Sequence, residues 1–302
     1  MSDNTTNTTN STNSTNSDKE TVLAICYDFD KTLSPKNMQE EGFIEALGGD
    51  EKAFWKDCDD IAKRYKMDSN LAYMYNMIKM AKNEDIPFNK PNIQKYAESI
   101  TLYDGVKTWF NRINDYGKKK GIIVEHYIIS SGLKEMVEAT EIAGEFKEIY
   151  ACSFCYDNNE VPFWPAQVVN YTGKTQFLFR IEKGVLDIND DAVNNYYTED
   201  KLRVPFRNMV YIGDSATDVP CMKLVNLNGG HSIGVYNPET KDKSRVYDMI
   251  KQNRIKYFVP ADYTENSKLE KLVKNIIDRT SYNEMLENFS YACKDEEKDQ
   301  RG

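Results

Sequence analysis

Two aspartates follow one apolar strand pattern at a spacing that could do chemistry. Asp28 and Asp30 stand one residue apart directly after the apolar run 22–27, and Thr32 comes two residues later. A carboxylate beside an apolar strand costs roughly several kcal/mol unless a cation or a hydrogen-bond network compensates it. One carboxylate of such a pair can attack an electrophile while the other moves a proton. The sequence therefore predicts a reactive centre at this strand end.

A second strand pattern and a glycine turn carry groups that can bind an anion. Ser130, Ser131 and Gly132 end a strand pattern ahead of a helical one, and they offer hydroxyl and backbone N–H donors. Lys174 follows Gly173 at the start of another helical pattern. A lysine beside hydroxyls can hold a phosphoryl group, because its positive charge offsets the charge on the phosphoryl oxygens.

A further strand pattern ends in Gly213 and Asp214, and Asp218 follows at the start of a helix. Oxygen ligands of this kind favour a hard cation, and few carboxylates combined with water and phosphate oxygens favour magnesium over calcium. Phosphoryl transfer depends mainly on positioning and on charge neutralisation. The four groups together predict magnesium-assisted phosphoryl transfer, in which Asp28 attacks phosphorus and Asp30 handles the proton.

The elements that must position these residues alternate between strand and helix. We expect strands over 22–27, 125–129, 148–154, 209–212, 232–235 and 257–259, and helices over 105–116, 133–143, 174–183, 218–225 and 267–279. This alternation predicts an α/β fold with a parallel sheet covered by helices on both faces. Ligands of such sheets bind beyond the carboxyl ends of the strands, so the polar strand ends should converge there.

Two segments interrupt the alternation. Residues 36–103 show only helical patterning, with Tyr73 and Met77 at core-like spacing, and residues 155–171 favour a β-hairpin. The segment 1–19 is almost entirely Ser, Thr, Asn and Asp and is expected to be disordered. The predicted division is a disordered tail over 1–19, a catalytic core over 20–35 and 104–285, a helical insertion over 36–103, and a C-terminal tail over 286–302.

The composition limits the classes of partner. The net charge of −9 argues against nucleic acid, because phosphate backbones require an excess of Lys and Arg. No apolar run is long enough to span a membrane, and the N-terminus lacks the pattern of a signal peptide. Six scattered cysteines suit a reducing compartment, so we expect a cytoplasmic protein. Cys152 and Cys155 alone have metal-like spacing, and we interpret them as strand or hairpin residues.

The motifs, taken in order, resemble the haloacid dehalogenase superfamily of aspartate-nucleophile phosphohydrolases. The match to DxDx[TV] at 28–32 is specific, and so is the Gly-Asp-x-x-Thr-Asp match at 213–218. The matches at Ser130 and Lys174 gain weight from their order along the chain. The resemblance covers roughly residues 20–280. It implies a Rossmann-like, three-layer core with a parallel sheet and an inserted helical cap domain, the cap being residues 36–103.

Carried onto this chain, the resemblance implies that Asp28 is the nucleophile and Asp30 the general acid and base. It implies a magnesium ion held by the Asp28 carboxylate, the Asp30 backbone carbonyl and Asp214. Asp218 would steady either the water molecules of the metal or Lys174. The implied activity is that of a phosphoric monoester hydrolase acting on a small phosphorylated metabolite.

The resemblance also implies a set of phosphate-binding residues. Thr32 would order the catalytic loop, Lys174 would neutralise the aspartyl-phosphate, and either Ser130 or Ser131 would bind the phosphoryl oxygens. Ser130 is favoured because it comes first after the strand and Gly132 follows two residues later.

The substrate is left open by the sequence. The hairpin before Lys174 is similar to that of the phosphoserine phosphatase-like branch, in which a cap-side glutamate binds the amino group of the substrate. Glu40 or Glu41 could serve here, but their offset from the first motif differs, and phosphoserine is not assigned. The alternatives are a phosphotransferase or phosphoprotein phosphatase on the same core, and a non-catalytic protein that binds a phosphorylated ligand.

Overall fold

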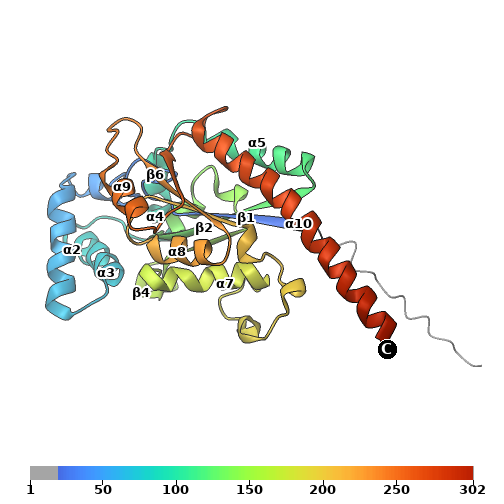
Figure 1. Cartoon of the computed structure of the whole chain (residues 1–302). Coiled ribbons are helices and arrows are strands. Elements are labelled where there is room, and N and C mark those ends of the chain that lie inside the picture. The colour runs from blue at the N-terminus through green and yellow to red at the C-terminus, as the bar shows by residue number, and fades with distance from the viewer. Residues whose placement is uncertain (1–19, 302) are drawn as a thin grey trace, which may run out of the picture.

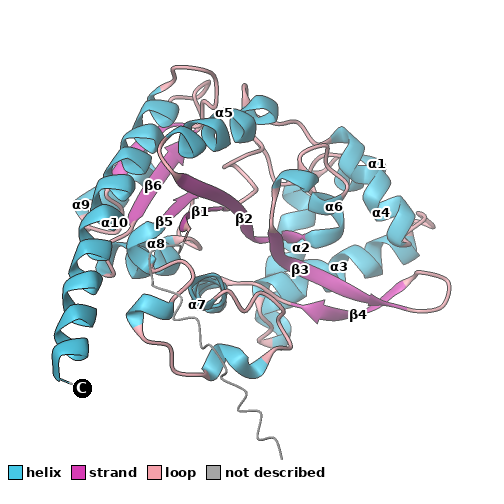
Figure 2. Ribbon diagram, turned by 90° about the vertical axis from the view of Figure 1, so that its right-hand side faces the viewer, coloured by secondary structure: helices cyan, strands magenta, loops and turns pink. Residues whose placement is uncertain are grey.

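A seven-stranded sheet forms the centre of the molecule (Figure 2). The computed structural model describes residues 20–301, so the tail predicted over 1–19 lies outside the described residues. The strands lie in the order β4-β3-β2-β1-β5-β6-β7, and neighbours are parallel except for β3 and β4, which are antiparallel. Their bounds are β1 (Thr21–Tyr27), β2 (Ile122–Leu133), β3 (Glu148–Tyr156), β4 (Pro162–Gln167), β5 (Met209–Gly213), β6 (His231–Tyr236) and β7 (Tyr257–Pro260).

Strand β1 lies in the middle of the sheet because its residues tolerate burial on both faces. Every residue from Val22 to Tyr27 is buried, as expected for a central strand of a parallel sheet. Tyr27 pairs with Ile128 of β2 on one side and with Ile212 of β5 on the other. The residues that follow β1 and β5, and the carboxyl end of β2, therefore share one edge of the sheet.

Helices cover both faces of the sheet, as the alternation of patterns predicts (Figure 1). The helices α5 (Val106–Lys119) and α10 (Lys268–Arg301) pack together on one face, and α7 (Thr175–Lys183) and α8 (Val219–Leu227) lie on the other. Shorter helices are α6 (Lys134–Glu138), α9 (Ser244–Lys251) and the 3-10 turns η2 (Ala97–Ser99), η3 (Ala143–Glu145), η4 (Tyr171–Lys174), η5 (Asp191–Asn194), η6 (Glu199–Lys201) and η7 (Phe206–Asn208). No helix among the described residues is long and apolar enough to cross a membrane.

The segment 36–103 is helical, as predicted. It contains α1 (Phe43–Ala46), α2 (Glu51–Tyr65), α3 (Ser69–Asn83) and α4 (Lys90–Tyr96). Asp50 and Asp68 cap α2 and α3, because their carboxylates accept backbone N–H groups of the first turn. In Figure 1, α2 and α3 lie at one end of the sheet. The boundaries of this segment as a separate domain stay a prediction.

The predicted hairpin is formed by β3 and β4. Asp157 begins the turn, and one of its carboxylate oxygens accepts the N–H groups of Asn159 and Val161. Cys152 and Cys155 both lie in β3 with free thiols. Their metal-like spacing therefore belongs to a strand, as the sequence interpretation holds.

Helix α10 corrects the prediction of a C-terminal tail over 286–302. The helix continues to Arg301, well past the expected end at Arg279. The second half of α10 contains no proline or glycine, which are the strongest helix breakers. Glu284 also accepts a hydrogen bond from Arg207 at 2.8 Å, which fixes this half against the core. A charged composition was mistaken for a frayed end.

Candidate active site

The three carboxylates predicted from separate motifs meet at one edge of the sheet. Asp28 follows β1, Asp214 follows β5, and the Asp28 N–H donates to the Ile212 carbonyl at 2.9 Å. Asp218 precedes the first turn of α8. Oxygen atoms of the three side chains all lie within 4.8 Å of one another, and all three residues are buried. This is the convergence expected when β1 lies between β2 and β5.

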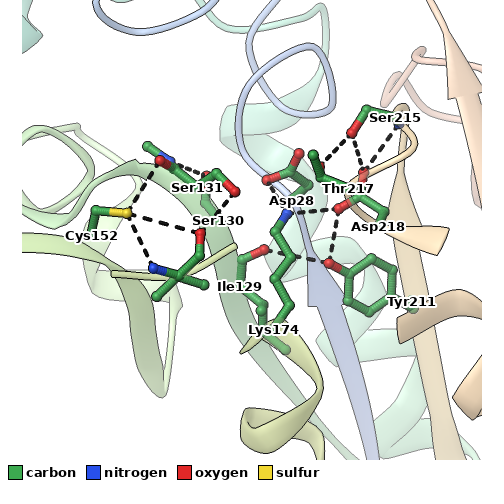
Figure 3. Close-up of polar contacts among 12 residues, drawn as sticks. Asp28, Ile129, Ser130, Ser131, Cys152, Lys174, Tyr211, Ser215, Thr217 and Asp218 are labelled. Atoms are coloured by element: carbon green, nitrogen blue, oxygen red, sulfur yellow. Dashed lines mark hydrogen bonds and ion pairs between the residues drawn. The ribbon is translucent and has the colours of Figure 1, made fainter. Parts of the chain in front are cut away.

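A single buried ammonium group lies between two of these carboxylates. Lys174 is fully buried, and its Nζ lies 2.8 Å from Asp218 Oδ1 and 3.2 Å from Asp28 Oδ1 (Figure 3). Lys174 ends η4, the turn after the hairpin, which points its side chain under the strand ends. Burial alone would lower the pKa of Lys174, but the charges of Asp218 and Asp28 outweigh that effect and raise it. Lys174 is therefore a permanent cation.

Asp218 holds Lys174 in place. Its Oδ1 accepts hydrogen bonds from Lys174 and, at 3.0 Å, from the Tyr211 hydroxyl (Figure 3). Its Oδ2 accepts the N–H and the hydroxyl of Ser215, both at 3.1 Å. The side chain is fully buried and does not line the adjoining cavity. Of the two roles left open by the sequence, this geometry fits the one that positions Lys174.

The carboxylates carry more negative charge than Lys174 balances. Burial and the charge of Asp218 raise the pKa of Asp28 to about 6, although Lys174 opposes the shift. Burial and the charges of Asp218 and Asp28 raise the pKa of Asp214 to about 8. The Arg245 guanidinium lies 3.1 Å from Asp214 Oδ2, but this side chain is 60% exposed and offsets the shift only in part.

The chemistry of this site fits a divalent cation. Asp28 Oδ1 is buried, with the Lys174 ammonium 3.2 Å away and no other donor to it among the described residues. Asp28 and Asp214 both line the cavity and offer only hard oxygen ligands. A divalent cation at these oxygens would remove the unbalanced charge that raises both pKa values.

Asp30 lines the cavity in surroundings that favour its protonated form. Its Oδ1 accepts the Met38 N–H at 2.8 Å, which fixes the side chain at the cavity. Burial and the nearby charge of Asp28 raise the pKa of Asp30 well above its usual range. A carboxyl group that stays protonated near neutral pH can donate its proton to a leaving oxygen.

The two serines differ in what their hydroxyls already bind. Ser130 Oγ accepts the Gly132 N–H at 3.1 Å, and its own proton has no acceptor among the described residues. Ser131 Oγ donates to the Val169 carbonyl at 2.9 Å (Figure 3). Both residues line the cavity, but only the Ser130 hydroxyl has a proton left to donate to an anion.

Thr32 does not reach the cavity. Its side chain is fully buried, and its hydroxyl has no hydrogen-bond partner within residues 20–301. The backbone is held firmly instead: the Thr32 N–H donates to Phe29 O at 3.2 Å, and the Thr32 carbonyl accepts the Tyr263 hydroxyl at 2.8 Å. Its position fits a role in ordering the loop after β1.

The helical segment contributes a wall of the cavity, although the sequence did not identify most of the residues that line it. The cavity measures about 190 Å³, and Asn37, Gln39, Trp55, Asn70 and Tyr73 line it opposite the strand ends. The Tyr73 hydroxyl donates to the Ser131 carbonyl at 2.9 Å and ties α3 to the core. Gln39 is 2% exposed, and no donor in the described part of the chain reaches its Oε1. Helical spacing predicts Tyr73 in the core of the helical segment, and the structure places it in that core at the edge of the cavity.

Neither candidate glutamate lines this cavity. Glu40 accepts hydrogen bonds from the Asn37 N–H at 3.2 Å and from the Trp55 indole at 3.0 Å. Glu41 accepts the N–H and the hydroxyl of Thr101, at 3.1 and 2.7 Å. Both carboxylates organise the helical segment and do not line the cavity. The side chains that line this wall are neutral.

Comparisons with known proteins agree with the motifs. The model of the haloacid dehalogenase-like hydrolase family matches residues 25–223. A protein of Borreliella burgdorferi without an assigned function is 25% identical in an alignment of 280 positions, which covers 83% of this chain and 95% of that protein.

Solved structures share the fold. A hydrolase of the same family from Salmonella enterica serovar Typhi has a TM-score of 0.56 and 18% identity, over 84% of this chain and 70% of that one. A phosphoserine phosphatase with a phospho-aspartyl intermediate analogue has a TM-score of 0.50 and 17% identity, over 84% and 99% of the two chains. The α/β fold and the family resemblance predicted from the sequence are confirmed.

Proposed function

Because the chain belongs to the haloacid dehalogenase-like hydrolases, we propose that it is a magnesium-dependent phosphatase that hydrolyses a small phosphomonoester. The observation that carries this proposal is the buried Lys174, which bridges Asp28 and Asp218 beside the cavity that Asp28 lines. A structural ion pair would need only one carboxylate, such as that of Asp218. Lys174 also lies beside the Asp28 carboxylate, which lines the cavity, and its charge favours the ionised form of that group. An ionised, desolvated carboxylate is a nucleophile.

The proposed first step uses Asp28 and Asp30. An Asp28 oxygen attacks phosphorus, the bond from phosphorus to the leaving oxygen breaks, and the leaving oxygen takes the proton of Asp30. Asp28 then carries the phosphoryl group as an aspartyl-phosphate. Ser130 donates a hydrogen bond to the phosphoryl oxygens, and Lys174 offsets their charge from beneath.

The second step reverses the role of Asp30. As a carboxylate it takes a proton from water, and the water oxygen attacks phosphorus. The bond between phosphorus and Asp28 breaks, which releases inorganic phosphate and restores both side chains. Dehalogenation leaves no oxygen to protonate, so the raised pKa of Asp30 favours phosphoryl chemistry.

The proposed metal ligands are the Asp28 carboxylate, the Asp30 backbone carbonyl and the Asp214 carboxylate. When bound, magnesium supplies positive charge that offsets the charge of the phosphoryl oxygens. Asp218 is proposed to act on this site through Lys174 and Ser215, which its two oxygens hold.

The proposed substrate is a small phosphorylated metabolite with a neutral leaving group. Gln39, Asn37 and Asn70 present amides to the cavity, and the nearest glutamates are engaged elsewhere. The buried Gln39 Oε1 lacks a donor, which a substrate hydroxyl would supply. The proposal favours hydroxyl-bearing phosphoesters over phosphoserine, and it assigns no role to nucleic acid or membrane.

A cytoplasmic location is also proposed. All six cysteines have free thiols, and four of them are fully or almost fully buried. Protein thiols persist in a reducing compartment, which supports this expectation.

A panel of phosphorylated metabolites tests the proposal. We expect the wild-type protein to release phosphate from at least one small phosphomonoester with magnesium and to lose this activity when the metal is chelated. Asp28→Asn should keep less than a few per cent of the rate and remain folded. Asp57→Asn, on the exposed face of α2, is the matched control and should retain full activity. Undiminished hydrolysis by Asp28→Asn would contradict the mechanism.

A further inference from the structure

The second half of α10 carries an apolar stripe that faces solvent. We call Tyr282, Met285, Leu286 and Phe289 the α10 stripe; their exposed fractions are 69, 65, 71 and 73%. Their spacing places them on one face of the helix. Single exposed apolar residues are common, but four large ones on one helix face mark an interaction surface.

The opposite face of the same helix contacts the chain's own core. Glu284 pairs with Arg207, and Asn288, Tyr291 and Ala292 line a groove of about 430 Å³ together with the loop around η6 and η7. Figure 1 shows this half of α10 extending beyond the sheet. This half of the helix therefore turns mostly polar residues toward the body of the protein and its apolar stripe toward solvent. A surface helix of a monomeric protein usually has the opposite orientation.

The chain offers no segment of its own to cover the stripe. Residues 2–19, which lie outside the described part, contain no apolar residue. A segment that covers the stripe must bury apolar surface against it. Ser, Thr, Asn and Asp offer little apolar surface for this. A second molecule with an apolar face could remove this surface from water.

We propose that the α10 stripe binds the α10 stripe of a second copy, antiparallel and across a two-fold axis. The four residues are separated by three, one and three positions, and this spacing is the same from either end of the helix. The stripe can therefore pair with an identical stripe that runs in the opposite direction. In this arrangement Tyr282 faces the partner's Phe289, and Met285 faces the partner's Leu286.

The charges that flank the stripe fit the same arrangement. Arg279 precedes the stripe and is exposed. Glu296 and Glu297 follow the stripe at its other end. Antiparallel pairing brings the basic end of one stripe to the acidic end of the other, whereas parallel pairing would place like charges together.

The size of the stripe sets the expected affinity. Large apolar side chains bury about 150–250 Å² each, so four at roughly two-thirds exposure offer on the order of 500 Å² per copy. Two copies would cover about 1,000 Å², which is near the lower limit for a specific interface. We expect a reversible dimer with a dissociation constant on the order of micromolar.

Sedimentation equilibrium on the full chain over a range of concentrations tests the proposal. The wild-type mass should rise from 34.9 kDa toward twice that value as concentration increases. The double variant Leu286→Glu/Phe289→Glu should stay monomeric, with unchanged helicity by circular dichroism. Tyr196→Glu, which alters an 89% exposed tyrosine elsewhere, is the control and should dimerise like the wild type. A monomeric wild type, or a dimeric double variant, would overturn the proposal.

Two further measurements separate the alternatives. In the antiparallel pair the exposed Cys293 residues lie about 22 Å apart along the axis, from 1.5 Å per residue, so diamide should not cross-link them. Rapid cross-linking at Cys293 would instead show a parallel pair and overturn the proposed orientation. A monomeric wild type that binds phospholipid vesicles, with the double variant failing to bind, would assign the stripe to a membrane surface.

Discussion

Replacing Lys174 with methionine should destabilise the protein much more than the loss of an ordinary surface lysine. Lys174 is fully buried between Asp28 and Asp218, at 3.2 and 2.8 Å. Removing one member of a buried ion pair costs about 3–5 kcal/mol, because the remaining charge is left without compensation. One carboxylate can take up a proton instead, which limits the cost. We therefore expect a loss of about 3 kcal/mol at pH 8 without magnesium.

The loss of stability in Lys174→Met should depend on pH. In the wild type the folded-state pKa of Asp28 is about 6, which is above the value in the unfolded chain. Without the lysine, this folded-state pKa rises further. An acid with a raised folded-state pKa contributes stability that is lost as the pH rises through that pKa. The Lys174→Met defect should therefore be smaller at pH 5 than at pH 8.

Urea denaturation at the two pH values, with EDTA or with magnesium, measures the effect. Lys120→Met is the matched control, because the Lys120–Asp278 ion pair at 2.7 Å is partly exposed and such pairs contribute about 0–1 kcal/mol. Magnesium should restore part of the stability of Lys174→Met, since a cation at the carboxylates replaces the lost charge. The reasoning is refuted if Lys174→Met costs no more than Lys120→Met at pH 8.

Three more substitutions test other parts of the site and core. Asp30→Asn should lower kcat by about 10²–10⁴ on an alkyl phosphate but much less on p-nitrophenyl phosphate, whose leaving group needs no proton; equal losses would remove the general-acid role. Tyr73→Phe removes the hydrogen bond to Ser131 and should cost about 1 kcal/mol of unfolding free energy and lower kcat/KM; unchanged values in both assays would contradict it. Burial lowers the pKa of His126 to about 3, so the neutral imidazole stabilises the fold fully above pH 6.5, and this contribution is lost as the pH falls below that value. In urea titrations, His126→Asn should reduce the pH dependence of the unfolding free energy by up to about 1.4 kcal/mol per pH unit between pH 4.5 and 6.5. An unchanged pH dependence would refute this.

The parts of the site predicted from the sequence are those encoded locally. Asp28 and Asp214 each follow an apolar run directly, so the strand and the polar residue at its end are visible together. The sheet order then brings them close, because parallel strands share an edge for their carboxyl ends. Lys174 was identified by its turn and its order among the motifs.

The residues that were missed depend on tertiary contacts. Gln39 and Trp55 carry no local signal of cavity lining, and α9 escaped prediction because it buries only two apolar residues, Val246 and Met249. Arg245, on α9, was therefore missed as well. Glu40 and Glu41 looked like ligand groups, but long-range hydrogen bonds to Trp55 and Thr101 engage them. Sequence spacing cannot show which partners a carboxylate finds across the fold.

The most direct test of the account is to trap the phosphoryl group on the protein. Wild-type protein should be mixed with magnesium and its best substrate, quenched in acid during turnover, and mapped by peptide mass spectrometry. We expect one phosphoryl group on the peptide that contains Asp28, and none in Asp28→Asn. Turnover with the phosphoryl group on a different residue, or with an Asp28→Asn variant that hydrolyses substrate as fast as the wild type, would contradict it.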